Sequence, residues 1–280
     1  MPRKTGAGPH SLLAVFAHPD DESLACGGLL AWCAALGMRV SLLSLTHGEH
    51  GQMDDGEGTG RTPPARDVRA TELRDAAGVL GITEVTLLDH EDGMLSWVDA
   101  EQLETDIRDA MQRLGPDVVI TFGEDGLYWH PDHIAVHERT TAAVAALADD
   151  APALYYVTMP AGAMRAVVNH AADITAGRDP DAVPPRTILG VTDADAFGAL
   201  AAAPTLVVET GEFAALKLRA LTCHRSQFRD CALALVDEHA ALRLLGAEHY
   251  RRSDVGARGD TFLDRFAAPR TPIRIDPART

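Results

Sequence analysis

Short apolar segments alternate with longer segments of helical periodicity along most of the chain. The apolar segments are nearly continuous in hydrophobic character, which is typical of strands buried on both faces of a parallel sheet. These predicted strands are Leu12–Ala17, Arg39–Thr46, Glu84–Leu88, Asp117–Phe122, Ala153–Thr158 and Thr205–Glu209. The predicted helices between them are Ala25–Leu36, Ala65–Leu80, Val98–Leu114 and Ile134–Leu147. This alternation predicts an α/β fold, a doubly wound, Rossmann-like and mostly parallel sheet with helices on both faces.

Glycines and irregular segments complete this organisation. Gly37, Gly81 and Gly115 directly follow three of the predicted helices, where a C-terminal glycine is favoured. Residues 48–64 are rich in Gly, Asp, Glu, Thr and Pro and predict a long loop, and residues 161–186 lack strong periodicity. We interpret 161–186 as either a lid or an insertion without a role. Residues 267–280 predict a peripheral tail, and the whole of 1–280 is interpreted as one domain.

Charge and composition exclude several classes of protein. The chain has 280 residues, with 25 Lys and Arg against 41 Asp and Glu, a net charge of -16. Such an acidic chain is not expected to bind nucleic acid, which requires a basic surface. No run of 18 apolar residues occurs, so no transmembrane segment is predicted. The four cysteines form no CxxC pair, which favours reduced thiols and a cytoplasmic location.

Ionisable side chains gather where the first four predicted strands end. His18-Pro19-Asp20-Asp21-Glu22 follows the first strand, and His130-Pro131-Asp132-His133 comes after the fourth. Of the 12 histidines, these four connections contain His18, His47, His50, His90, His130 and His133. Open α/β sheets bind ligands beyond the carboxyl ends of their strands. Histidines and carboxylates together at that edge indicate a metal site.

Several of these residues have a second interpretation. Asp21 and Glu22 could stabilise a helix N-terminus, although His18 has no such explanation. Asp132 could orient a ligand histidine or cap its own helix. His137 lies one turn after His133 and is expected to pack or face solvent rather than to bind metal. The remaining candidates for either the rim of the site or a solvated loop are His47, Glu49 and His50.

The two motifs, in this order and each after a strand, resemble those of the PIG-L (LmbE-like) deacetylases. That family includes the N-acetylglucosaminyl-phosphatidylinositol de-N-acetylases and deacetylases of the mycothiol and bacillithiol pathways. The resemblance covers roughly residues 11–150 and 205–228. It extends to Thr121-Phe122-Gly123, and later to Lys217 and His224-Arg225-Ser226-Gln227.

The resemblance implies a role for individual residues. It implies zinc ligands at His18, Asp21 and His133, and a general base at Asp20. It further implies that His130 stabilises the oxyanion or protonates the leaving amine, and that Tyr128 contributes near the oxyanion. Weaker matches imply substrate-binding roles for Arg69 and Asp92. His224 could reach the cleft and bind substrate, or it could equally be a hydrogen-bonded structural histidine. The chain departs from the pattern at Trp129, where many relatives have glycine.

The chemistry of the motifs agrees with the resemblance. A site with two histidines and one carboxylate leaves a zinc position open for water, whose pKa zinc lowers to about 7. Asp20 is then available to move protons. No Gly-x-Ser-x-Gly motif occurs, and Cys26-Gly27-Gly28 does not satisfy a dinucleotide-binding Gly-x-Gly-x-x-Gly.

The sequence therefore predicts a hydrolase with one zinc or other divalent ion that removes an N-acetyl group from an N-acetylglucosamine-type conjugate. Its partner is a small-molecule glycoconjugate substrate, and the sequence leaves the oligomeric state open. One alternative is an amidase of the same family that cleaves a larger thiol-conjugate amide. A second alternative is a non-catalytic protein that binds sugar or metal, against which Asp20 argues because the ligand set does not require it.

Overall fold

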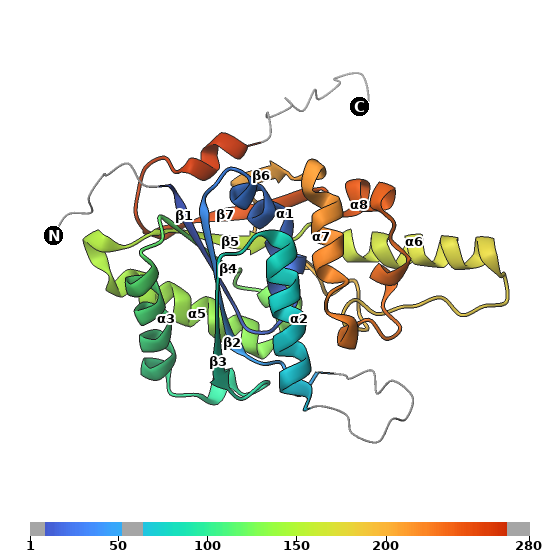
Figure 1. Cartoon of the computed structure of the whole chain (residues 1–280), viewed down its shortest axis with the longest axis horizontal. Helices are drawn as coiled ribbons and strands as arrows, with labels where there is room; N and C mark the ends of the chain where they lie inside the picture. Colours follow the sequence, from blue (N-terminus) through green and yellow to red (C-terminus); the bar gives the residue numbers. More distant parts are fainter. Residues whose placement is uncertain (1–8, 52–63, 268–280) are drawn as a thin grey trace, which may run out of the picture.

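The computed structural model describes residues 9–51 and 64–267. Its single sheet has the strand order β3-β2-β1-β4-β5-β7-β6 (Figure 1). The strands are β1 (Ser11–Phe16), β2 (Arg39–Thr46), β3 (Glu84–His90), β4 (Val118–Phe122), β5 (Ala153–Thr158), β6 (Leu206–Glu209) and β7 (Ala247–Gly256). All neighbours pair in parallel except β7, which is antiparallel to β5 and to β6. The prediction of a mostly parallel α/β sheet is confirmed.

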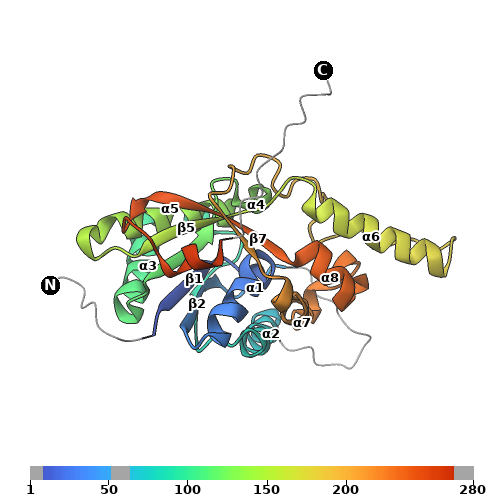
Figure 2. The same ribbon diagram turned by 90° about the horizontal axis from the view of Figure 1, so that it is seen from above.

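Helices cover both faces of the sheet. The longer helices are α1 (Asp21–Ala35), α2 (Ala65–Leu80), α3 (Ala100–Leu114), α5 (Pro131–Ala146) and α6 (Ala163–Arg178), and the shorter ones are α4 (Gly126–Trp129), α7 (Ala214–Leu221) and α8 (Glu238–Leu245). Helices α1, α2 and α7 lie on one face and α3 and α5 on the other (Figures 1 and 2). No helix in the described ranges is long and apolar enough to cross a membrane.

The order of the strands reverses between β1 and β4. The chain moves from β1 outward to β2 and β3, and then returns to β4 on the other side of β1. Leu12 pairs with Val118 and Ala14 with Ile120, so the two strands end side by side. Ligands bind at such a reversal in open α/β sheets. The two motifs that follow β1 and β4 therefore meet at this point.

Some predicted boundaries were wrong. Helix α1 begins at Asp21 rather than at residue 25, because the Leu24 amide already donates to the Asp20 carbonyl at 3.0 Å. Residues 163–178, predicted as part of a loop, form α6, which extends away from the sheet (Figure 2). Its buried side chains Met164, Val167, Val168 and Ala171 have the i, i+3, i+4, i+7 spacing of a helix face. Most of the loop predicted at 48–64 and the tail at 267–280 lie outside the described residues.

Candidate active site

The first motif forms a tight turn between β1 and α1. Asp20 has φ 108° and ψ -25°, a left-handed conformation that is uncommon for a residue other than glycine. The Glu22 carboxylate accepts the Asp20 amide at 3.1 Å, and the Asp21 carboxylate accepts the His18 amide at 2.8 Å. Motif side chains thus hold the backbone of their own turn. As a result, the carboxyl groups of Asp20 and Asp21 have different neighbours.

The structure brings together the three side chains predicted to bind a metal. His18 Nδ1 lies 3.1 Å from His133 Nε2 and 3.4 Å from an Asp21 oxygen, and the other Asp21 oxygen lies 3.3 Å from His133 Nε2. A four-coordinate zinc ion with bonds of about 2.0–2.2 Å separates neighbouring ligand atoms by roughly 3.3 Å. The two nitrogens are therefore as far apart as neighbouring ligands of one zinc ion, and the Asp21 carboxylate presents one oxygen to each of them at a similar distance.

The second nitrogen of His18 contacts two buried carboxylates. His18 Nε2 lies 3.0 Å from Asp92 and 3.3 Å from Asp132. Although His18, Asp92 and Asp132 are close enough to form a metal site themselves, Asp132 already accepts the amides of Gly93 (2.8 Å) and Leu95 (3.1 Å). The contacts thus favour the interpretation that Asp132 orients His18. The alternative that Asp132 caps its own helix is wrong, because the His130 side chain occupies that position.

His133 lies in the first turn of α5, and His130 is the N-cap residue of this helix. His133 Nδ1 lies 3.1 Å from the Gly126 carbonyl, and its ring stacks on Phe122 at 3.9 Å. Burial, only partly opposed by Asp21, lowers the pKa of His133 to about 3, so its Nε2 lone pair is available to a metal. His130 lies 4.8 Å from the His18 ring, and its Nδ1 accepts the Asp132 amide. The neutral His130 ring therefore carries its proton on Nε2.

The charge around these histidines suits a cation. Burial raises the pKa of Asp21, but His133 and His18 reverse this effect and bring it to about 2. Burial also raises the pKa of Asp92, but the contact with His18 has the larger effect, and the pKa of Asp92 is lowered overall. Both carboxylates are therefore ionised and nearly inaccessible to water. Buried negative charge of this kind is stable only beside a cation. Burial lowers the pKa of His18, but contacts with Asp132, Asp21 and Asp92 raise it well above its usual value, so either protonated His18 or a metal ion in place of its proton can compensate these carboxylates.

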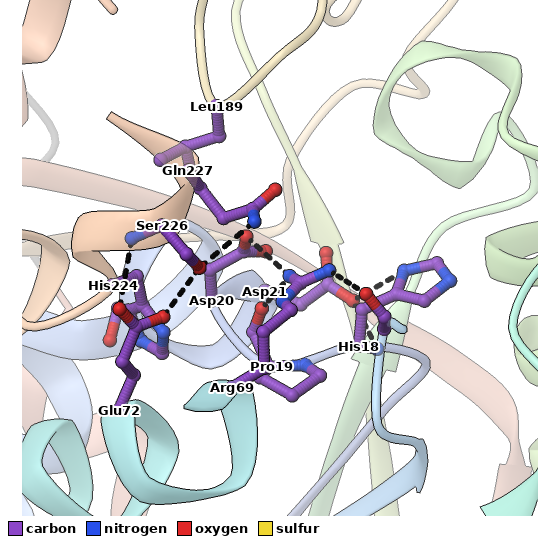
Figure 3. Close-up of polar contacts among 12 residues, drawn as sticks. His18, Pro19, Asp20, Asp21, Arg69, Glu72, Leu189, His224, Ser226 and Gln227 are labelled. Atoms are coloured by element: carbon purple, nitrogen blue, oxygen red, sulfur yellow. Dashed lines mark hydrogen bonds and ion pairs between the residues drawn. The ribbon is translucent and has the colours of Figure 1, made fainter. Parts of the chain in front are cut away.

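Asp20 faces Arg69 rather than the histidines. Arg69 Nη2 donates to Asp20 at 2.9 Å and to the Pro19 carbonyl at 2.5 Å, while Nη1 donates to the Gly48 carbonyl at 2.6 Å (Figure 3). Gly48 has φ 64°, and a Cβ there would collide with the guanidinium group. Burial raises the pKa of Asp20 to about 7, although Arg69 opposes this effect. A carboxyl with this pKa can both take up and release a proton near neutral pH.

A buried pair lies behind Asp20. Besides accepting the Asp20 amide, Glu22 contacts His224 Nε2 at 3.2 Å and accepts the Ser23 hydroxyl at 2.5 Å. Both Glu22 and His224 are fully buried. His224 is not among the residues that line the cavity, so its contacts support a role in positioning Asp20 rather than in binding substrate. No local pattern indicates that two residues 202 positions apart form a pair.

A cavity of about 330 Å³ opens above the site. It is lined by predicted residues, namely His18, Asp20, Asp21, Arg69, Asp92, Tyr128 and His130. It is also lined by Gln227, which belongs to the family-like element His224-Arg225-Ser226-Gln227, and by residues that sequence reasoning missed, namely Leu24, Gly51, Gly93, Ile188, Leu189, Gly190, Val191 and Phe197. No described residue from 161–186 lines it. The position of α6 therefore gives no support to the interpretation of 161–186 as a lid over this cavity.

The remaining candidates have other neighbours. His137 Nδ1 donates to the Phe122 carbonyl at the end of β4 at 2.9 Å, and the His137 ring lies 4.6 Å from Tyr156. His50 lines the cavity, whereas His47 lies 3.0 Å from the exposed Asp89. Glu49 accepts the Asp92 amide at 3.2 Å. Trp129 has φ 68°, the conformation that favours glycine, and its half-exposed side chain does not line the cavity.

Comparison with known proteins identifies the family. Residues 13–144 match the PIG-L family, described as GlcNAc-PI de-N-acetylase. A 1D-myo-inositol 2-acetamido-2-deoxy-alpha-D-glucopyranoside deacetylase 2 from Catenulispora acidiphila is 31% identical over 277 residues, which cover 88% of this chain and 89% of that protein.

Solved structures share the fold at low identity. An N,N'-diacetylchitobiose deacetylase from Pyrococcus horikoshii is 17% identical with a TM-score of 0.58, covering 86% of this chain and 83% of its own. A 4-carboxy-2-hydroxymuconate hydratase from Pseudomonas putida also gives 17% and 0.58, covering 90% and 99%. Because one fold carries two reactions, function follows from the site and from the sequence match rather than from the fold. From the extent of that match, the chain belongs to the PIG-L family of deacetylases.

Proposed function

We propose that this protein is a zinc-dependent hydrolase that removes the N-acetyl group from an N-acetylglucosamine-type conjugate. The observation that carries the proposal is the convergence of His18, Asp21 and His133, whose side chains approach one another within 3.1–3.4 Å, with Asp20 on the same turn but outside that set. A protein that only bound metal would not require the additional buried carboxyl group. The whole described chain acts in this proposal as one catalytic domain.

His18, Asp21 and His133 hold one zinc ion in this proposal. When bound, zinc supplies a Lewis acid and allows water to act as a nucleophile at neutral pH. Asp92 and Asp132 fix the His18 ring through its other nitrogen, and the Gly126 carbonyl fixes His133. Such supporting contacts set which ring nitrogen is free to bind the metal.

Asp20 moves the protons. With a pKa of about 7 it can take a proton from the attacking water and later pass one to the leaving amine. Arg69 holds the carboxyl through Nη2 and is itself held by the carbonyls of Pro19 and Gly48. In this role Arg69 orients the base and also lines the cavity, where it can reach the substrate.

His130 and Tyr128 stabilise the oxyanion. His130 lines the cavity with Nε2 protonated, and burial together with the neighbouring His18 lowers its pKa. Burial raises the pKa of Tyr128 well above its usual value, so its hydroxyl remains a donor. Donors fixed before the reaction stabilise developing negative charge more than mobile water does.

The substrate is a small glycoconjugate that carries a 2-acetamido-2-deoxyglucose unit. The name of the Catenulispora acidiphila relative describes an acetamido-deoxyglucopyranoside deacetylase, which supports this substrate class for the present chain. We also propose a cytoplasmic location, which is supported by four cysteines that are all free, three of them buried.

An acetate-release screen tests the proposal. N-Acetylglucosamine conjugates are incubated with zinc-loaded protein, with and without a chelator, and acetate and free amine are both measured. We expect equal amounts of acetate and amine, and no product with the chelator. Release of a larger acid from a thiol-conjugate amide, without acetate, would instead identify the related amidase. Binding without any product would identify a non-catalytic protein.

A further inference from the structure

The walls of the cavity differ in chemistry. The residues at the strand ends are polar or charged, whereas the segment between α6 and β6 contributes Ile188, Leu189, Val191 and Phe197. Leu189 and Val191 are partly exposed, and Ile188 and Phe197 are buried. None of these four side chains has a nitrogen or oxygen atom. Figure 3 shows Leu189 above the Asp20–Arg69 pair, with Gln227 between them. We name residues 188–191 together with Phe197 the apolar wall.

The backbone of the apolar wall forms an unusual turn. Ile188 and Val191 donate to each other's carbonyls, both at 2.9 Å, and enclose Leu189 and Gly190. Leu189 has φ 47° and Gly190 has φ 86°. Two-residue turns with both φ values positive normally contain Asn, Asp or Gly. A leucine at the first position is strained, and strained residues concentrate at functional sites. Leu189, the residue in this strained position, lines the cavity.

The apolar wall is held by contacts on both sides. The Thr187 amide donates to the Asp230 carbonyl at 3.1 Å, and the Ala232 amide donates to the Thr187 carbonyl at 2.8 Å. At the other end, the Gly198 amide donates to the Leu127 carbonyl at 2.9 Å, and the Phe197 ring lies 4.7 Å from Tyr128. These bonds fix the wall in place beside the catalytic residues. A site fixed in advance binds without a cost of ordering.

We propose that the apolar wall binds an apolar aglycone of the glycoside substrate. This inference rests on the proposed function, because it places the 2-acetamido-2-deoxyglucose unit over the polar residues. A hydroxyl group pressed against the wall would lose its water without gaining a partner, which costs about tenfold or more in affinity. An aromatic or aliphatic aglycone loses no hydrogen bond to water there, and burial of its apolar surface favours binding. The enzyme is therefore selective for apolar conjugates over polyol conjugates.

Three substrates with the same reacting group test this selectivity. The zinc-loaded protein is assayed with the phenyl, methyl and 1D-myo-inositol 2-acetamido-2-deoxy-α-D-glucopyranosides, and kcat/KM is determined from acetate release. We expect the phenyl glycoside to exceed the inositol glycoside by about tenfold or more. Equal values, or a preference for the inositol glycoside, would overturn the proposal.

A matched pair of variants locates the effect. Leu189→Asn removes the apolar side chain but suits the left-handed backbone, which asparagine adopts readily, so the turn is retained. Leu200→Asn makes the same change at a side chain that is 73% exposed and does not line this cavity. We expect Leu189→Asn to reduce the phenyl-to-inositol ratio by about tenfold and Leu200→Asn to leave it unchanged. An unchanged ratio in Leu189→Asn would refute the assignment.

Two further measurements distinguish this proposal from an acyl-binding role of the wall and from a failure of the proposed function. A methyl glycoside with an N-hexanoyl group tests the acyl side, and its preference over all three acetamides would overturn the aglycone assignment. If no substrate releases acetate, the proposed function fails, and binding of phenyl α-D-glucopyranoside and myo-inositol to the zinc-loaded protein is measured by calorimetry. Preferential phenyl glucoside binding that Leu189→Asn weakens supports the wall as an apolar subsite, and equal binding overturns it.

Discussion

Replacing Asp20 with asparagine separates proton transfer from metal binding. Asparagine has nearly the same shape, and its oxygen can still accept from Arg69, which lies 2.9 Å from the aspartate. It cannot take a proton at neutral pH. General acid–base groups contribute about 10²–10⁴-fold in rate, or roughly 2.7–5.4 kcal/mol of barrier. We therefore expect Asp20→Asn to lose kcat by this factor while it retains zinc.

The same substitution should stabilise the protein when zinc is removed. Burial raises the pKa of Asp20 from 3.8 to about 7, so the unfolded chain releases this proton at a lower pH than the folded chain. The stability due to the neutral carboxyl is therefore present below pH 3.8 and is lost as the pH rises to about 7. At 1.36 kcal/mol per pKa unit, the ceiling of this loss is roughly 4 kcal/mol. Asparagine has no such loss.

Two assays test these expectations on the same pair of proteins. Zinc content and acetate release are measured for Asp20→Asn and, as the matched control, Asp21→Asn, which we expect to lose zinc and to recover partly in excess zinc. Urea unfolding of the chelated proteins at pH 4 and pH 8 should show a stability advantage of Asp20→Asn that grows with pH. Loss of zinc in Asp20→Asn, with zinc and activity retained in Asp21→Asn, would reverse the two roles.

Other predictions concern the residues around the metal ligands. Glu22→Gln should lower kcat tenfold or more with KM and zinc content unchanged, because it loosens the Asp20 backbone. The control Ser23→Ala should leave kcat within twofold. Equal losses of kcat in the two variants would show that Glu22 acts only through general stability. Asp132→Asn should weaken zinc binding by about 10–100-fold in a chelator competition, and unchanged affinity would rule out its support of His18. His137→Ala should retain full zinc content by metal analysis, and loss of the ion would make His137 a ligand.

The sequence predicts the centre of the fold well because its strands are buried on both faces. A continuous apolar run such as Arg39–Thr46 has few alternatives, and its observed bounds equal the predicted ones. β7 was missed because its sequence is polar. Glu248 is buried in this strand, where Lys217 at 2.7 Å and the amides of Gly28 and Leu29 satisfy it. Such partners come from other parts of the chain, so the local sequence alone predicts an exposed segment here rather than a buried strand.

The candidate site likewise has a part that the sequence predicts and a part that it does not. Both motifs follow strands that end side by side, so topology alone predicts that His18 and His133 meet. The contact of Asp92 with His18, and the pairing of Glu22 with His224, depend on how distant loops approach each other. The apolar wall comes from a segment with only a short apolar run. Its strained Leu189 is visible in the backbone and not in the sequence.

A zinc titration of the metal-free protein tests the central claim most directly. Zinc is added in steps to a chelated and dialysed sample, and bound zinc and the rate of acetate release from an N-acetylglucosamine conjugate are measured at each step. The account predicts that activity rises in proportion to bound zinc and saturates at one ion per chain, and that the His18→Ala protein neither binds zinc at this site nor gains activity. Full acetate release by the metal-free protein, or zinc-dependent activity in His18→Ala equal to that of the wild type, would contradict it.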